Sequence, residues 1–180
     1  MVPTCIAYLS LASSSDCLYR WAETIFDMML GLPVSPRHGF FVMIDESEFP
    51  VGRPHRRPGA HIDGNWTPEG WNTPGEWSPG GHTKCSVRDL KPEAIVLASS
   101  RYGCDGYVGD FETEEDFRDG GDCSHFPLEK LKRFPIPAGV AAVGNVTFIH
   151  ESVPIQAPPG FISIKRQLVR LNIPGWELKA

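Results

Sequence analysis

Apolar residues recur at helical spacing in one long stretch near the start of the chain, which ends at Met28 or Met29. Polar residues suited to capping come before this stretch, and Gly31, followed by Pro33, comes after it. A capping sequence at the start and a glycine at the end are typical of a helix. The pattern therefore predicts an amphipathic helix over Asp16–Leu30 that packs against the outside of a sheet.

From residue 39 onward the pattern changes to short apolar runs that are separated by glycine and proline, as in β-structure. The predicted strands are Phe40–Ile44, Ala94–Ala98, Gly106–Phe111, Val140–Val143, Val146–Ile149 and Ile162–Ile173. An earlier run, Cys5–Leu11, is predicted as an edge strand. Strands without helices between them favour an antiparallel sandwich or barrel. We therefore expect one mainly β domain over residues 1–180, in which residues 1–38 support a barrel formed by residues 39–175.

Composition narrows the class of protein. The chain has 180 residues, enough to bury a hydrophobic core without disulfides or structural metals. Its 17 prolines and 18 glycines are consistent with many turns between short strands. A net charge of −5 argues against a nucleic-acid backbone as partner. No apolar run approaches the ~20 residues that span a bilayer, so no membrane is expected. The five cysteines include no CxxC pair, which favours reduced thiols in a cytoplasmic protein.

Two histidines and one carboxylate have the spacing of a metal site. His61 and Asp63 are two positions apart, so on a strand both side chains point to the same face. His150 follows an apolar run much later in the chain. Two imidazoles and a carboxylate form a facial set that leaves positions on iron(II) open for a chelating cosubstrate and O2.

Two arginines follow the second histidine on a predicted strand. By alternation, Arg166 and Arg170 share a face with Ile162, Ile164 and Leu168. Arginines on an otherwise aliphatic, inward face are expected to meet anions. An arginine there would hold the distal carboxylate of a 2-oxo acid in a bidentate manner.

With these residues the chain resembles the iron(II)/2-oxoglutarate-dependent dioxygenase superfamily, whose motif is HxD, a distal His and then an Arg. The motif falls on His61, Asp63, His150 and Arg166, and the resemblance covers about residues 40–173. It implies a double-stranded β-helix, a jelly-roll or cupin-like barrel, with the predicted helix packed outside. It also implies oxidation of a C–H bond coupled to the decarboxylation of 2-oxoglutarate to succinate.

The resemblance assigns roles to the residues of the motif. The catalytic residues His61, Asp63 and His150 would bind Fe(II), and Arg166 would anchor 2-oxoglutarate. Arg170 competes for that anchoring role, or contacts an anionic group of the substrate. The substrate is expected to be a small polar or anionic molecule; a modified nucleobase stays open, as does the oligomeric state.

A long loop follows the first two predicted ligands. Gly64–Gly81 interleaves tryptophans with glycine and proline, so it fits neither a helix nor a strand. Its tryptophans either cover an exposed apolar flank or form a lid whose members, Trp66 and Trp71 among them, meet a substrate. Arg57 belongs to a basic cluster before the metal motif, which is either a solvated turn or an anion-attracting rim of the site.

Two alternatives stay open. A cupin-like metalloenzyme would keep the barrel and the metal but would need no arginine anchor. A non-catalytic jelly-roll binding protein would use the tryptophans as a platform and the two histidines as core residues. The remaining histidines lack a partner at a suitable spacing and are assigned no chemistry: His38, His55, His82 and His125.

Overall fold

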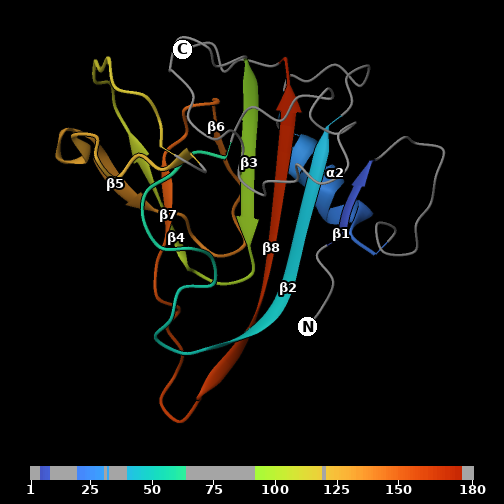
Figure 1. Cartoon of the computed structure of the whole chain (residues 1–180). Helices are drawn as coiled ribbons and strands as arrows, with labels where there is room; N and C mark the ends of the chain where they lie inside the picture. Colours follow the sequence, from blue (N-terminus) through green and yellow to red (C-terminus); the bar gives the residue numbers. More distant parts are fainter. Residues whose placement is uncertain are drawn as a thin grey trace.

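The computed structural model describes residues 5–8, 20–30, 32, 40–63, 92–118 and 121–175. Its regular elements, labelled in Figure 1, are mostly strands. They are β1 (Cys5–Tyr8), α2 (Ala22–Leu30), β2 (Phe41–Pro50), β3 (Glu93–Ser99) and β4 (Cys104–Val108). They continue with the 3-10 helix η4 (Leu128–Lys130), β5 (Lys132–Pro135), β6 (Ala142–Gly144), β7 (His150–Ser152) and β8 (Ser163–Pro174).

The strands form two antiparallel sheets, as a sandwich requires. The larger sheet has the order β1-β2-β8-β3-β6, and the smaller one has the order β5-β4-β7. The long strand β8 lies in the middle of the larger sheet, paired with β2 on one side and β3 on the other. The prediction of a mainly β, antiparallel chain is confirmed, and so is the edge position of the first strand.

Helix α2 covers one face of the larger sheet, behind β2 and β8 in Figure 1. Its buried residues Ile25 and Met28 pack in one cluster with Val42, Val96 and Leu171, which lie on three neighbouring strands. Burial of each such side chain contributes about 1.5–3 kcal/mol relative to exposure. The predicted helix therefore lies on the outside of a sheet, as expected from its apolar face.

The opposite face of the larger sheet packs toward the smaller sheet. Ile95 and Leu97 from β3 meet Ile136 and Phe148 in a second cluster. Gly144 makes this packing possible, because a Cβ at this position would lie 2.3 Å from Cγ of Phe148. The space between the two sheets therefore contains this apolar cluster, and the candidate site lies beside the cluster.

The structure corrects one predicted strand and adds another. The segment predicted as a strand at Val146–Ile149 is not one; the Asn145 side chain accepts a hydrogen bond from the Thr147 backbone N–H at 3.1 Å, and β7 begins at His150. Strand β5 was not predicted, since its residues are largely exposed and its sequence, Lys-Arg-Phe-Pro, lacks an apolar run.

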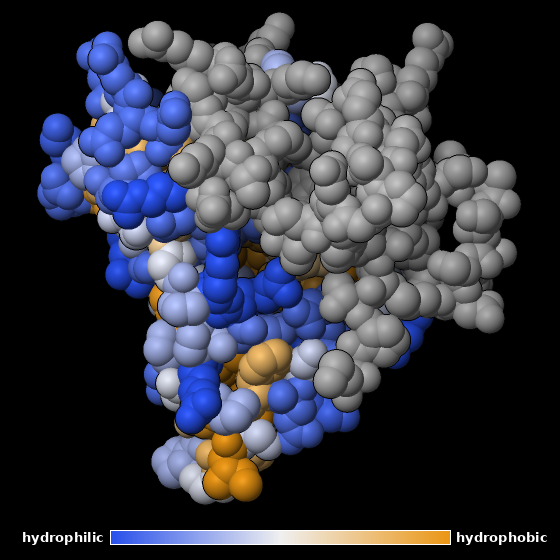
Figure 2. Space-filling view, viewed as in Figure 1, coloured by the Kyte–Doolittle hydropathy of each residue, from blue (hydrophilic) through white to orange (hydrophobic). Residues whose placement is uncertain are grey.

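The surface of the described residues is mostly hydrophilic in the view of Figure 2, apart from an apolar tip at the lower end. Exposed Phe161 and Ile162 belong to the loop that leads into β8 at that end of the molecule. Among the described residues, no helix combines the length and the apolar character needed to cross a bilayer.

Candidate metal centre

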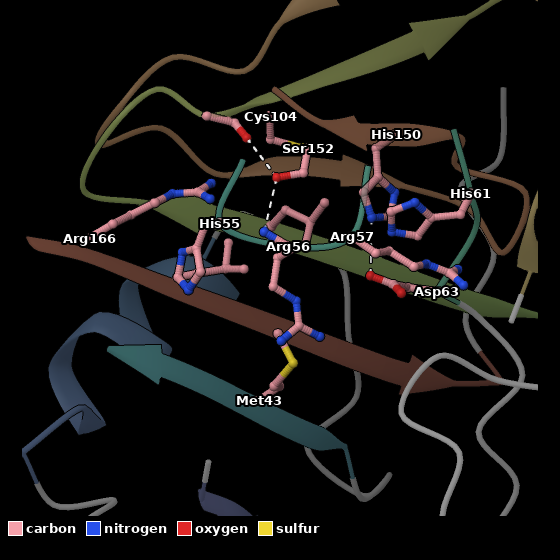
Figure 3. A pocket seen from close by; sticks show the side chains of 13 residues that line it. Met43, His55, Arg56, Arg57, His61, Asp63, Cys104, His150, Ser152 and Arg166 are labelled. Carbon is pink, nitrogen blue, oxygen red and sulfur yellow. Dashed lines mark hydrogen bonds and ion pairs between the residues drawn. The ribbon is translucent and has the colours of Figure 1, made fainter. Parts of the chain in front are cut away.

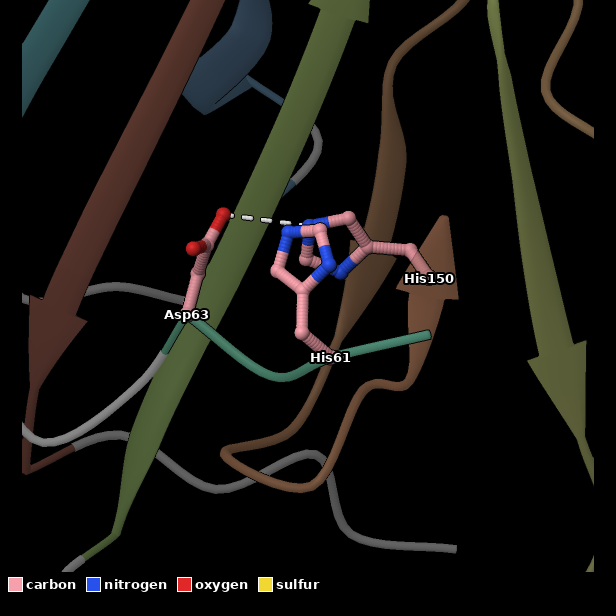
Figure 4. Close-up of side chains that lie close together, drawn as sticks. All are labelled: His61, Asp63 and His150. Atoms are coloured by element: carbon pink, nitrogen blue, oxygen red, sulfur yellow. Dashed lines mark hydrogen bonds and ion pairs between the residues drawn. The ribbon is translucent and has the colours of Figure 1, made fainter. Parts of the chain in front are cut away.

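His61, Asp63 and His150 come together as the sequence predicts. One ligand atom from each, two imidazole nitrogens and a carboxylate oxygen, lies within 4.8 Å of the others. All three residues are buried, and Figure 4 shows their side chains pointing toward one another. This is the donor set that a single metal ion can bridge.

Backbone pairing explains why the two histidines are neighbours. The His61 N–H donates to the His150 carbonyl at 2.9 Å, and the His150 N–H donates to the His61 carbonyl at 3.0 Å. Directly opposed residues of an antiparallel pair project to the same face, and the two ring centroids are 4.6 Å apart. His61 forms an isolated bridge rather than part of a regular strand. The predicted strand is therefore reduced to one paired residue, yet the side chains are adjacent.

Both imidazoles are oriented by backbone carbonyls. Nδ1 of His61 lies 2.8 Å from the Gly59 carbonyl, and Nδ1 of His150 lies 3.1 Å from the Phe148 carbonyl. A ring that donates from Nδ1 keeps a lone pair on Nε2, which is the form that binds a metal. Burial, followed by the positive charge of a protonated His150, lowers the pKa of His61 to about 4, so this ring is neutral at pH 7.

The carboxylate of Asp63 is held from several sides. Arg170 forms an ion pair with it, and Nε2 of His150 lies 3.1 Å from Oδ2. Burial alone would raise the pKa of Asp63, but these neighbours outweigh it and hold the pKa well below its usual range. The Asn172 amide also donates to the Asp63 carbonyl at 3.0 Å and to the buried Glu93 carboxylate at 2.8 Å. Residues of β8 and β3 thus fix both the backbone and the side chain of Asp63.

A cavity of about 330 Å³ adjoins the three candidate ligands. Its walls carry Met43, His55, Arg56, Arg57, His61, Asp63, Leu97, Gly103, Cys104, His150, Ser152, Arg166 and Leu168. In Figure 3, Arg166 lies at one end of the row of lining side chains and the candidate ligands lie at the other. The predicted metal ligands and the predicted anchor for a carboxylate therefore share one cavity.

Arg166 is an almost completely buried cation, with 1% of its surface exposed. Its Nε donates to the Ser99 hydroxyl at 2.7 Å, whereas Nη1 has no hydrogen-bond partner among the described residues. Burial lowers the pKa of this guanidinium, with no carboxylate close enough to form an ion pair within the described part of the chain. Gly103 leaves room for the group, since a Cβ there would lie 3.0 Å from Cζ of Arg166.

Of the other predicted site residues, one lines the cavity, one lies outside it, and two fall outside the described residues. Arg170 does not line the cavity; it lies behind Asp63 as its ion-pair partner. Arg57 lines the cavity, as expected for a rim residue. Trp66 and Trp71, with the whole predicted lid of residues 64–81, lie outside the described residues.

Sequence reasoning missed His55 and Asn172. The His55 side chain is fully buried in the cavity wall, with Nε2 3.1 Å from Oδ2 of Asp45. Chiefly because of this contact, the pKa of Asp45 is lowered to about 2. Polar residues at alternating positions of β2 and β8 were the available signal, since Asp45 and Asn172 both lie on the inner face.

No protein-family model matches the chain, and neither the curated proteins nor the solved structures include a match to it.

Proposed function

We propose that this protein is a non-haem Fe(II)- and 2-oxoglutarate-dependent oxygenase acting on a small polar or anionic substrate. In the overall reaction, the substrate C–H bond, O2 and 2-oxoglutarate give a C–OH bond, succinate and CO2. One atom of O2 enters the product and the other enters succinate, so the two-electron oxidation of the substrate is matched by decarboxylation of the 2-oxo acid.

The donor set of the candidate centre suits a divalent iron ion. Two imidazoles and one carboxylate occupy one side of a metal, and His61, Asp63 and His150 supply these groups. When bound there, iron(II) would supply open positions for a 2-oxo acid and O2, and with them the oxidising power. The chain's own contribution is to keep the imidazole lone pairs directed inward and the carboxylate ionised.

The observation that carries the proposal is the buried guanidinium of Arg166 in the same cavity, which forms no ion pair within the described residues. A buried cation without an anionic partner is costly, and Nη1 has no hydrogen-bond partner among the described residues. A ligand that chelates a metal at one end and presents a carboxylate at the other would satisfy both ends of the cavity. 2-Oxoglutarate has these two groups, and Arg166 would bind its distal carboxylate.

The order in which the chain visits the two sheets supports a double-stranded β-helix. It runs through β2 in the larger sheet, pairs at His61 with the smaller one, and returns to the larger sheet as β3. It then passes through β4 and β5 of the smaller sheet, β6 of the larger, β7 of the smaller, and β8 of the larger. Repeated alternation between two antiparallel sheets is the winding expected of a jelly roll.

The size and charge of the cavity favour a small substrate. Its volume of about 330 Å³ lies at the low end of ligand pockets. Besides Arg166, two further arginines, Arg56 and Arg57, line it, and Arg56 is paired with Asp45. Positive charge on this wall favours a substrate that carries a carboxylate, a phosphate or another polar group.

The test is to load the purified protein with Fe(II) and measure succinate formed from 2-oxoglutarate under O2. We expect O2-dependent succinate release, and no release from His150→Ala, which loses a ligand. With Mn(II) in place of iron and without O2, calorimetry should show 2-oxoglutarate binding that Arg166→Met weakens by at least about 30-fold.

Two outcomes would contradict the proposal. Stoichiometric metal without 2-oxoglutarate binding favours the cupin-like metalloenzyme. Failure to bind any divalent metal favours the non-catalytic jelly-roll protein. Arg133→Met is a matched control, because Arg133 pairs with Asp105 and Glu151 outside the cavity and should leave both measurements unchanged.

A further inference from the structure

His55 is a buried polar residue that the proposed chemistry does not yet use. Its side chain is 0% exposed, and its ring packs against Phe49 at a tilt of 41°, with centroids 3.8 Å apart. Nε2 lies 3.1 Å from Oδ2 of Asp45, but neither ring nitrogen makes a hydrogen bond of good geometry within the described residues. A buried ring nitrogen without a partner, in a cavity wall, suggests a ligand contact.

The strand register places His55 beside Arg166. Asp45, Ser47 and Phe49 alternate along the same face of β2, and Ser47 pairs directly with Arg166 on β8. Because His55 contacts both Asp45 and Phe49, its ring lies over the position between them. His55 and Arg166 both line the cavity and lie at the same end of it in Figure 3. Both residues carry buried nitrogens that have no hydrogen-bond partner among the described residues, and both belong to the wall of this cavity.

The pair of Asp45 and His55 fits a group that binds an anion. Nε2 faces the Asp45 carboxylate at 3.1 Å, and an imidazolium also has a donor at its other nitrogen, Nδ1. An imidazolium that lies between the Asp45 carboxylate and a ligand carboxylate can form a charge-assisted hydrogen bond with each of them. Asp45 is ionised at neutral pH, because His55 and the other donors around it lower its pKa to about 2.

We propose that His55, held by Asp45, is a second anchor for the distal carboxylate of 2-oxoglutarate beside Arg166. This inference rests on the proposed function and adds a residue to its cosubstrate site. Arg166 supplies a guanidinium, and His55 supplies a ring N–H donor beside it.

The experiment is calorimetry on the Mn(II)-loaded protein without O2, with 2-oxoglutarate and with 2-oxopentanoate, in which a methyl group replaces the distal carboxylate. We expect His55→Gln to weaken 2-oxoglutarate binding by about tenfold and to leave 2-oxopentanoate binding unchanged. His125→Gln is the matched control, since His125 lies outside the cavity with Glu115 at 3.7 Å.

Asp45→Asn provides a second route if His55→Gln does not fold. It keeps the shape of the pair but removes the carboxylate that holds the ring, so 2-oxoglutarate should again bind more weakly than in wild type, with 2-oxopentanoate binding unchanged. Equal 2-oxoglutarate affinity in wild type and in the folded variants would overturn the inference, with the proposed function intact. Absence of 2-oxoglutarate binding in the metal-loaded wild type would overturn both.

Discussion

Arg166 and Arg170 lie four residues apart on the inner face of β8, and each has a different partner. Arg170 meets the Asp63 carboxylate, whereas Arg166 meets the Ser99 hydroxyl and the cavity. An arginine that neutralises a metal-binding carboxylate orients that ligand. An arginine whose Nη1 has no partner among the described residues is available to a bound anion. The contacts of the two side chains therefore favour Arg166 over Arg170 as the anchor for the proposed cosubstrate.

The lowered pKa of a single residue, His61, makes the stability of the metal-free protein depend on pH. Its folded-state pKa is about 4 against an ordinary value of 6.5, so between these values the unfolded chain binds a proton that the folded chain excludes. Stability therefore falls as the pH falls. From about pH 7.5 to about pH 5 the free energy of unfolding should decrease by about 2 kcal/mol through this group. Urea unfolding of the metal-free protein at both pH values measures the change.

His61→Gln should remove most of this decrease. Asp63 contributes little in the same window, because its lowered pKa leaves it ionised in both the folded and the unfolded chain until the pH approaches its ordinary value of 3.8. An unchanged pH dependence in His61→Gln would show that another group carries the effect.

At the scale of elements, the sequence predicts what depends on local pattern. The helix, most of the strands and the location of His61 and Asp63 in one site were predicted from spacing, although only His61 is paired. The short strand β5 does not, because an exposed strand has no apolar pattern. The contact of His55 with Asp45 also depends on how the chain turns back over β2 after Pro50, which no local pattern encodes.

Gly103 comes directly before β4, and its backbone lies close to the Arg166 side chain in the cavity wall. In Gly103→Ala the new methyl would lie 3.0 Å from Cζ and 3.2 Å from Nη1 of Arg166, so the guanidinium must shift. We expect about tenfold weaker 2-oxoglutarate binding and unchanged metal affinity, both measured by calorimetry with Mn(II).

Gly144→Ala is the contrasting variant. Its methyl would meet Phe148 between the sheets, away from the residues that line the cavity. Gly144→Ala should lower the thermal midpoint of unfolding without selectively weakening the binding of 2-oxoglutarate. Equal cosubstrate affinity in Gly103→Ala and wild type would show that Arg166 does not need this space.

At the scale of the whole molecule, the candidate metal centre joins the two sheets. His150 begins β7 in the smaller sheet, and His61 pairs with it. Asp63 is tied to β8 of the larger sheet through Arg170 and Asn172. A metal ion bound by all three ligands would therefore connect layers that otherwise meet through side-chain packing.

This arrangement predicts that metal binding stabilises the fold as a whole. A metal that binds the folded chain alone, at about 100 times its dissociation constant, adds about 2.7 kcal/mol to the free energy of unfolding. For a chain of this size the thermal midpoint should rise by about 5–10 °C, and a chelator should reverse the change. Calorimetric melting with and without metal measures it.

The required control is His150→Ala, whose midpoint should not respond to metal. Because the ligands belong to both sheets, hydrogen exchange should slow in β7 and in β8 together when metal is added. Slower exchange confined to β7 and its neighbours would instead mean that Asp63 is not a ligand, since the two histidines alone do not reach the larger sheet.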